Sequence, residues 1–330
     1  MGYINGLKKG DKVATREAYG RGLCELGADH DFAVLDADLA EATKTCYFAK
    51  AFPDRFFDCG IAEGNMIGVA AGLAAADKPV FASSFAMFAA GRAFEQIRNS
   101  VAYPHLNVKI AATHAGITVG EDGATHQCLE DIALMRVLPG MTVISPADAV
   151  EAVAALKAAL EMTGPCYLRF GRYAVPVLHD PDTYRFEIGK GEVLRDGSDV
   201  TIVANGILVS MALTAADTLA AEGISARVIN IHTVKPLDTE LLCAAAAETG
   251  AVVTAEEHNI IGGLGSAVAE TLAENCPVPM VRVGVRDSFG RSGKVPELLA
   301  LYGLTPEALC DAARRAVAAK KTGKTERNGV

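Results

Sequence analysis

The stretch VKIAATHAGITVGEDGATHQ, residues 108–127, shows the pattern that decides the fold. It joins an apolar run with strand character (108–113) to a loop rich in glycine, acids and histidine, and an Ala-rich segment of helical period (87–102) precedes it. The same order of short strand and longer helix recurs along the chain. Such alternation is typical of a mostly parallel sheet covered by helices on both faces, so we predict an α/β fold.

Two sets of alternating elements indicate two domains. In the first half we predict strands at 32–35, 79–82, 108–113, 142–144 and 166–169, and helices at 16–26, 64–76, 87–102 and 147–161. In the second half we predict strands at 200–204, 226–231, 251–254 and 280–283, and helices at 208–221, 239–248, 265–274 and 306–319. Prolines interrupt the pattern between the two sets, and 330 residues exceed what one core usually organises. We therefore predict an N-terminal extension (1–12), a first domain (13–175), a linker (176–190), a second domain (191–319) and a disordered tail (320–330).

Composition restricts the possible functions. Half of the residues are hydrophobic and 22% are charged, as in a folded globular chain. The net charge of -9 disfavours sequence-independent binding to nucleic acid or to an anionic membrane. The eight cysteines are dispersed without a CxxC pair, and the N-terminus shows no apolar signal-peptide region. We therefore predict a cytoplasmic protein with reduced thiols and no metal site of its own.

Two glycine-containing loops are candidate binding sites. The loop after strand 108–113 carries His114, Asp122 and His126, and ligands of parallel α/β sheets bind at the carboxyl ends of the strands. A merely solvated loop is the alternative. The segment GGLGS, 262–266, could bind phosphate through its backbone N–H groups at the start of a helix. Because it lacks the GxGxxG order, a tight structural turn is the favoured interpretation.

A second candidate site lies earlier in the chain. Glu63 stands at the start of an apolar helix, where it is either an exposed acid favoured by the helix dipole or a buried carboxyl group able to share a proton. Phe85 and Phe88 are three residues apart, and they would form one aromatic face if their segment is helical. Ordinary core packing is the alternative for this pair.

Four separate motifs resemble one known family. They are GIAEGNM, SSFAMFAAGRAFEQIR, THAGITVGEDGATHQ and LEDIALMRVLPGMTV, and in this order they resemble the carboxyl-terminal half of transketolase over about residues 13–317. The resemblance implies a pyrimidine-binding domain followed by the transketolase C-terminal domain. The family's further domain binds the cofactor diphosphate through a GDG motif and Mg²⁺ through an Asn-bearing segment, and no such motif occurs in this sequence. The resemblance therefore implies one subunit of a split, two-subunit transketolase.

The resemblance also implies a cofactor and partners. The cofactor is thiamine diphosphate, with the Mg²⁺ ligands on an N-terminal partner subunit in a heterotetramer. Glu63 matches the glutamate that exchanges a proton with the cofactor's pyrimidine ring, a role that needs a carboxyl group sheltered from water. Phe85 and Phe88 match aromatic residues packed around that ring. Asp38 matches an acid near the cofactor, and a cap at the end of a strand is its alternative role.

Sugar recognition follows from the same resemblance. His114, Asp122 and His126 match residues of the substrate channel, in which the acid discriminates a hydroxyl configuration and the histidines bond donor or acceptor oxygens. Arg16 and Arg172 match arginines that hold the terminal phosphate of the sugar, where the planar guanidinium suits a bidentate contact. We expect His114 to assist them, with an imidazole that is partly protonated near neutral pH.

The match to the family is incomplete at two positions. A third aromatic residue of some members is replaced by Gly91, which predicts a more open cofactor pocket on that side. The serine that often joins the phosphate-binding arginines has no clear counterpart, although Thr43 lies one position away.

Three alternatives remain at this point. The enzyme 1-deoxy-D-xylulose-5-phosphate synthase has a similar loop, but the position of His114 is usually not histidine there. The beta chains of 2-oxo-acid dehydrogenases have a similar length and also work beside an alpha chain, but they lack the GEDGxTHQ spacing. A non-catalytic relative that kept the fold is the third alternative. Retention of the acid, the aromatic pair, the histidines and the arginines favours a two-carbon ketol transferase acting on sugar phosphates.

Overall fold

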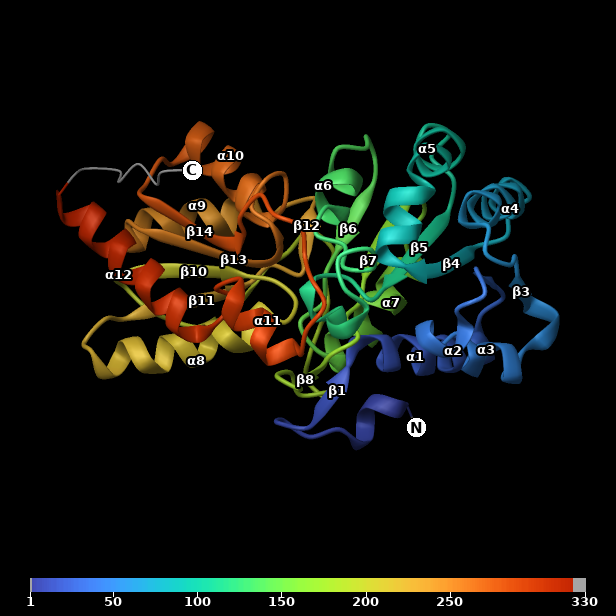
Figure 1. The fold of residues 1–330 in the computed structure, drawn as a ribbon, viewed down its shortest axis with the longest axis horizontal. Helices are drawn as coiled ribbons and strands as arrows, with labels where there is room; N and C mark the ends of the chain where they lie inside the picture. Colours follow the sequence, from blue (N-terminus) through green and yellow to red (C-terminus); the bar gives the residue numbers. More distant parts are fainter. Residues whose placement is uncertain (1, 323–330) are drawn as a thin grey trace.

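The computed structural model describes residues 2–322, which form two lobes side by side (Figure 1). Each lobe is built on its own sheet with helices on both faces. The first half of the chain forms one lobe and most of the second half forms the other, while one strand of the second half joins the first sheet. This arrangement confirms the predicted fold class of two α/β domains.

The first sheet has seven strands in the order β12-β6-β7-β5-β4-β2-β3. All neighbours pair in parallel except β12, which is antiparallel to β6. The strands are β2 (Ala33–Asp36), β3 (Phe56–Asp58), β4 (Val80–Phe85), β5 (Val108–Thr113), β6 (Thr142–Ile144), β7 (Cys166–Arg169) and β12 (Thr233–Lys235). Two further strands, β1 (Lys12–Ala14) and β8 (Ala174–Pro176), form an antiparallel pair below it.

Apolar helices cover both faces of this sheet. One buried cluster joins it to α4 (Glu63–Ala75), α6 (Asp131–Arg136) and a broken helix made of π-helical Met87–Arg92, α5 (Phe94–Gln96) and π-helical Ile97–Ala102. The other cluster joins it to α1 (Thr15–Asp29), α3 (Cys46–Ala51) and α7 (Ala149–Glu161). A short helix, α2 (Ala40–Thr43), follows β2. Small alanine side chains along these helices let them pack closely on strands that are buried on both sides.

The second sheet has five strands in the order β14-β13-β10-β11-β9. Only the edge strand β9 (Glu192–Arg195) runs antiparallel; the others are β10 (Val200–Ala204), β11 (Ala226–Asn230), β13 (Val252–Asn259) and β14 (Met280–Val285). Helices α8 (Leu208–Ala221), α11 (Val295–Leu301) and α12 (Pro306–Thr322) share one buried cluster. Helices α9 (Thr239–Thr249) and α10 (Leu264–Asn275) share the cluster on the opposite face.

Several local expectations need correction. The helix predicted at 87–102 is interrupted by two π-helical segments, and the one predicted from 147 begins at Ala149 because the Asp148 side chain accepts the N–H of Glu151 as an N-cap. Strand β12 was not predicted, although it extends the first sheet with residues from the second half of the chain.

The predicted disordered tail also begins too early. Lys320 to Thr322 continue α12, and the Lys320 ammonium group donates a hydrogen bond to the carbonyl of Thr249 at 2.6 Å. The rest of that tail, 323–330, lies outside the described residues, and the predicted domain boundaries remain predictions. No helix among residues 2–322 has the length and apolar character needed to span a bilayer.

Candidate active site

The predicted site residues meet at the carboxyl edge of the first sheet. Strands β4 and β5 are parallel neighbours with Phe85 opposite Thr113, so the residues that follow them emerge side by side. The His114 ring stacks on the Phe85 ring with centroids 3.7 Å apart. The Phe88 ring stacks on Phe85 with centroids 5.8 Å apart, and His126 meets Phe88 edge-on at 5.3 Å.

The aromatic pair forms in a different way from the prediction. Phe85 ends strand β4, while Phe88 lies in the π-helical segment that starts at Met87, so a shared helical face is wrong. The turn from strand to helix nevertheless brings the two rings to an interplanar angle of 11°. Together with His114 and His126 they form a cluster of four rings, which can pack against an aromatic ligand ring.

Glu63 opens helix α4 with a side chain that is only 2% exposed. It is therefore a buried carboxyl group, and the exposed-acid alternative is excluded. Both of its oxygens accept hydrogen bonds from one guanidinium nitrogen of Arg92, at 2.9 and 3.0 Å. The Arg92 guanidinium also lies over the Phe88 ring, 4.8 Å from its centroid. Arg92 was missed at the sequence level because the partner of a buried acid is set by helix packing across 29 positions of the chain.

A group of basic side chains lies on the other side of His114. Arg16, on α1, donates to the Nε2 atom of His114 at 3.0 Å and to the carbonyl of Ala42 at 2.9 Å. Burial and the nearby Arg172 guanidinium lower the pKa of Arg16. Lys44 adds a further positive charge close enough to act on His114. Like charges held this close favour an anion between them, and Lys44 was not among the predicted residues.

The structure corrects the expected charge of His114. Its ring is 2% exposed, and burial together with the charges of Arg16 and Arg172 lowers its pKa to about 3. His114 is therefore neutral near neutral pH. Because a guanidinium only donates, Nε2 accepts from Arg16, and Nδ1 carries the proton that is donated to the Thr113 hydroxyl at 2.8 Å. This side chain can orient a polar group but supplies no charge for holding a phosphate.

Arg172 and Asp122 lie close together at the rim of the site. The Arg172 guanidinium donates to the carbonyl of Val119 and lies 3.6 Å from the Asp122 carboxylate and 4.0 Å from Glu121. Asp122 is exposed and His126 half-buried, so both are open to a ligand. The predicted sugar-binding acid is thus an ion-pair partner of the predicted phosphate-binding arginine.

Asp38 and Thr43 are placed differently from the others. Asp38 is exposed, and its side chain makes no hydrogen bond or ion pair with residues 2–322. Asp36, two residues earlier, takes the alternative role of capping the strand end: it is buried, accepts from the Leu39 N–H at 2.7 Å, and has a pKa raised by burial to about 6. The Thr43 hydroxyl donates to Asp36 at 2.7 Å and is fully buried, so Thr43 does not replace the missing serine.

The two glycine positions have simple structural explanations. At Gly91 a Cβ atom would collide with the Met87 side chain, so Met87 occupies the space that the sequence suggested was open. At the start of α10, the Glu256 carboxylate accepts from the N–H groups of Leu264 and Gly265 at 2.6 and 2.8 Å. This buried carboxylate takes the place that a phosphate would need, which favours the structural turn.

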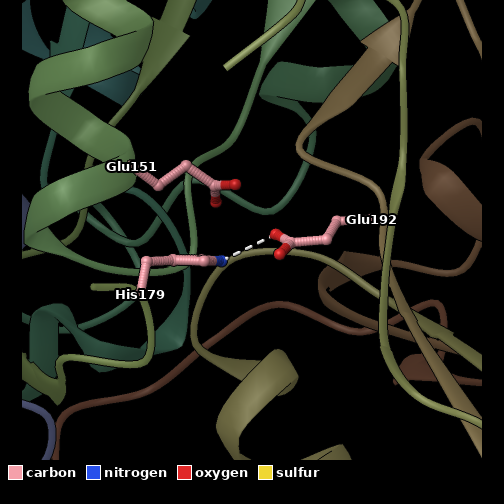
Figure 2. A group of neighbouring side chains, drawn as sticks. All are labelled: Glu151, His179 and Glu192. Carbon is pink, nitrogen blue, oxygen red and sulfur yellow. Dashed lines mark hydrogen bonds and ion pairs between the residues drawn. The ribbon is translucent and has the colours of Figure 1, made fainter. Parts of the chain in front are cut away.

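A separate polar cluster joins the linker to both domains (Figure 2). Glu151 of α7, His179 of the linker and Glu192 of β9 hold their ligand-type atoms within 4.8 Å of one another. His179 nitrogens lie 2.9 Å from Asp148 and from Glu192, while Glu151 accepts from the Tyr184 hydroxyl at 2.5 Å. These donors and acceptors already satisfy one another, so the cluster is an ion-paired clamp between segments. No other group of three such residues within metal-binding distance occurs in the described part of the chain.

The fold and the site define a class of protein: a pair of parallel α/β domains with a buried acid, an aromatic shelf and a basic rim at the edge of the first sheet. Family models for "Transketolase, pyrimidine binding domain" and "Transketolase, C-terminal domain" match residues 11–177 and 189–309. The chain therefore belongs to the transketolase family and carries these two of its domains, as the sequence motifs predicted.

Individual relatives agree with this assignment. A putative transketolase C-terminal section of Methanocaldococcus jannaschii is 51% identical over 309 residues, covering 93% of this chain and 96% of the relative. A 6-deoxy-6-sulfo-D-fructose transketolase subunit of Clostridium sp. is 49% identical, covering 86% and 88%. A solved structure described as a split gene transketolase, inactive beta4 tetramer, is 58% identical with a TM-score of 0.88, covering 93% and 99%.

Proposed function

We propose that this chain is the C-terminal subunit of a thiamine-diphosphate-dependent transketolase, which transfers a two-carbon ketol unit from a ketose phosphate to an aldose phosphate. The observation that carries the proposal is the juxtaposition of buried Glu63, the Phe85–Phe88 stack and the Arg16–His114–Arg172 group at one sheet edge. An acid sheltered from water beside an aromatic shelf fits the pyrimidine ring of the cofactor. The free state of all eight cysteines fits the proposed location in the cytoplasm.

Glu63 supplies the proton chemistry in this proposal. When bound, thiamine diphosphate supplies a carbon nucleophile at its thiazolium ring, provided that its pyrimidine ring is protonated. The Glu63 carboxyl group holds and returns that proton. Phe85 and Phe88 exclude water from its surroundings, and Arg92 keeps its carboxylate in place through the two hydrogen bonds at 2.9 and 3.0 Å.

The rim residues bind the sugar. We assign the terminal phosphate to Arg16 and Arg172, joined by Lys44, because these are the cations grouped around His114. Neutral His114 acts indirectly, because its Nε2 atom accepts from Arg16 and so orients that guanidinium towards the phosphate. His126 and Asp122, which are less buried, contact the sugar hydroxyl groups. The relative described as a 6-deoxy-6-sulfo-D-fructose transketolase subunit carries a sulfo group in its named sugar. This supports an anionic group on the substrate of this chain as well, at the end of the sugar that Arg16 and Arg172 hold.

The partner completes the proposal. The family's diphosphate-binding GDG motif and Asn-bearing metal segment do not occur in this sequence. On that resemblance we place the diphosphate and Mg²⁺ ligands on an N-terminal subunit, in a heterotetramer of two copies of each chain. The relative described as an inactive tetramer of beta chains supports activity only in the mixed assembly.

Reconstitution tests this function. We expect the purified chain alone neither to bind thiamine diphosphate tightly in calorimetry nor to turn over ketose phosphates, and we expect activity when a candidate N-terminal subunit and Mg²⁺ are added. Tight cofactor binding by this chain on its own would contradict the split-enzyme proposal. A mixed assembly that binds cofactor without transferring ketol units would support a non-catalytic relative instead.

A further inference from the structure

We infer that Glu257, a residue of the second domain, is a positioning residue that holds the loop 114–127 in the shape needed for sugar binding. The inference rests on the proposed function for the meaning of that shape. Glu257 lies on β13, where its side chain is 5% exposed. Its carboxylate accepts the backbone N–H of Thr118 at 2.6 Å, across 139 positions of the chain. Thr118 stands between His114 and Asp122, so this contact fixes the first part of the loop.

The loop passes unusually close to Glu257. Gly116 has a φ of +82°, and a Cβ atom there would collide with the Glu257 carboxyl group. Both the backbone angle and the lack of space require glycine at this position. The close approach at Gly116 shows that the loop and the carboxylate are packed directly against each other.

Glu257 is fixed by its strand and by the neighbouring buried Arg169. Burial raises the pKa of the Glu257 carboxyl group, while Arg169 and the Thr118 N–H oppose that rise. The Arg169 guanidinium donates to the Glu257 carbonyl at 2.9 Å and to the Asp131 carboxylate at 2.8 Å. The backbone of Glu257 is therefore fixed both by strand β13 and by the Arg169–Asp131 ion pair. These contacts do not depend on the loop.

Further contacts attach the same loop to the second domain. The Gln127 amide donates to the carbonyls of Arg291 at 3.0 Å and of Gly120 at 3.1 Å, and the Ser292 hydroxyl donates to the carbonyl of Glu121 at 2.6 Å. These bonds hold the later part of the loop to the second domain, and the Thr118 N–H attaches the first part of the loop to the same domain. The Ala115 N–H in addition donates to the Phe170 carbonyl of the first domain at 3.2 Å. Since glycine loses the most conformational freedom on ordering, a loop with three positive-φ glycines depends on such anchors.

Loss of the Glu257 anchor has a selective consequence. Asp122, His126 and the Val119 carbonyl that binds Arg172 all lie on the loop beyond Thr118. Glu63, Phe85 and Phe88 lie on other elements. We therefore expect a loosened loop to weaken sugar binding while cofactor binding stays unchanged.

The test compares Glu257→Ala with Glu257→Gln and Glu256→Ala. The glutamine variant keeps an acceptor for the Thr118 N–H. The Glu256→Ala variant is the matched control, because Glu256 is also a buried glutamate of β13 but accepts from the N–H groups of Leu264 and Gly265 at α10. In the chain, we expect Glu257→Ala to speed amide hydrogen exchange over 116–122 by about ten- to hundredfold, as for a lost hydrogen bond to a charged group. Glu257→Gln should stay near the wild type, and Glu256→Ala should speed exchange at 264–266 only.

Kinetics in the assembled enzyme complete the test. We expect Glu257→Ala to raise the KM for the acceptor sugar about tenfold, with the cofactor affinity unchanged. Unchanged exchange over 116–122, or equal loosening of the loop by Glu256→Ala, would overturn the inference. Faster loop exchange in an assembly without ketol transfer would support the positioning role while contradicting the proposed function.

Discussion

The ion-paired clamp around His179 makes the stability of this chain depend on pH. His179 is 4% exposed and bridges the carboxylates of Asp148, at the start of α7, and Glu192, on β9. Burial alone lowers its pKa, but these two carboxylates raise it to about 10. The unfolded chain has a histidine pKa of about 6.5. Because the folded state binds the proton more tightly, the stabilisation is complete below pH 6.5 and is lost as pH rises towards 10.

The size of the effect follows from the shift. A difference of one bound proton between the folded and the unfolded chain changes the free energy of unfolding by about 1.4 kcal/mol per pH unit. Between about pH 7 and about pH 9 nearly this full slope applies, so the free energy of unfolding falls by about 2.5 kcal/mol. The Glu192 side chain is 39% exposed, and solvent screening of its charge reduces the expected loss to about 2 kcal/mol. We expect urea unfolding to show this loss for the wild type at fixed protein concentration. In His179→Gln the corresponding part of the pH dependence should be missing.

The matched control is His232→Gln. His232 is buried nearby, and burial lowers its pKa, so the folded chain gains no stability from protonating it over this pH interval. We expect its variant to keep the pH dependence of the wild type, even if its stability is lower at every pH. An equal pH dependence in wild type and His179→Gln would refute the clamp.

Two further predictions concern the assembled enzyme. Glu63→Gln keeps an acceptor for Arg92 but cannot exchange a proton, so we expect activation of thiamine diphosphate to slow by ~10²-fold or more, measured as hydrogen–deuterium exchange at the thiazolium carbon. An unchanged exchange rate would leave Glu63 with a purely structural role. Arg172→Ala removes a charge-assisted bond of about 1.5 to 3 kcal/mol, so the KM for a phosphorylated aldose should rise roughly ten- to hundredfold. Glycolaldehyde serves as the acceptor without a phosphate, and equal losses on both acceptors would contradict a phosphate contact.

The central strands of both sheets could be predicted because their signal is local. Runs such as 108–113, 142–144, 166–169 and 200–204 coincide with β5, β6, β7 and β10, since strands buried on both faces read as continuous apolar sequence. The short edge strands β3, β9 and β12 were missed. They form because a neighbouring strand offers unpaired backbone groups, which is a property of the folded sheet.

The candidate site divides in a similar way. Glu63, Phe85, His114, His126 and Arg16 were found from motifs, and the parallel strands bring their segments to one edge. The charge state of His114 was expected wrongly, because its pKa is lowered by burial in the folded chain and by the Arg16 guanidinium of α1. Arg92 and Lys44 were missed because their closeness to Glu63 and to His114 exists only in the folded chain.

The sequence by itself determined the alternation of strands and helices, the family and the residue types of the site, because each of these is carried by local pattern and spacing. Only the tertiary structure decided which charges face one another: Arg92 against Glu63, Arg172 against Asp122, and Glu257 against the Thr118 N–H. Those pairings join positions 29 to 139 residues apart. Electrostatic and hydrogen-bond energies depend on the distance between two groups and on their burial. Neither quantity can be read from the number of residues that separate the groups in the sequence.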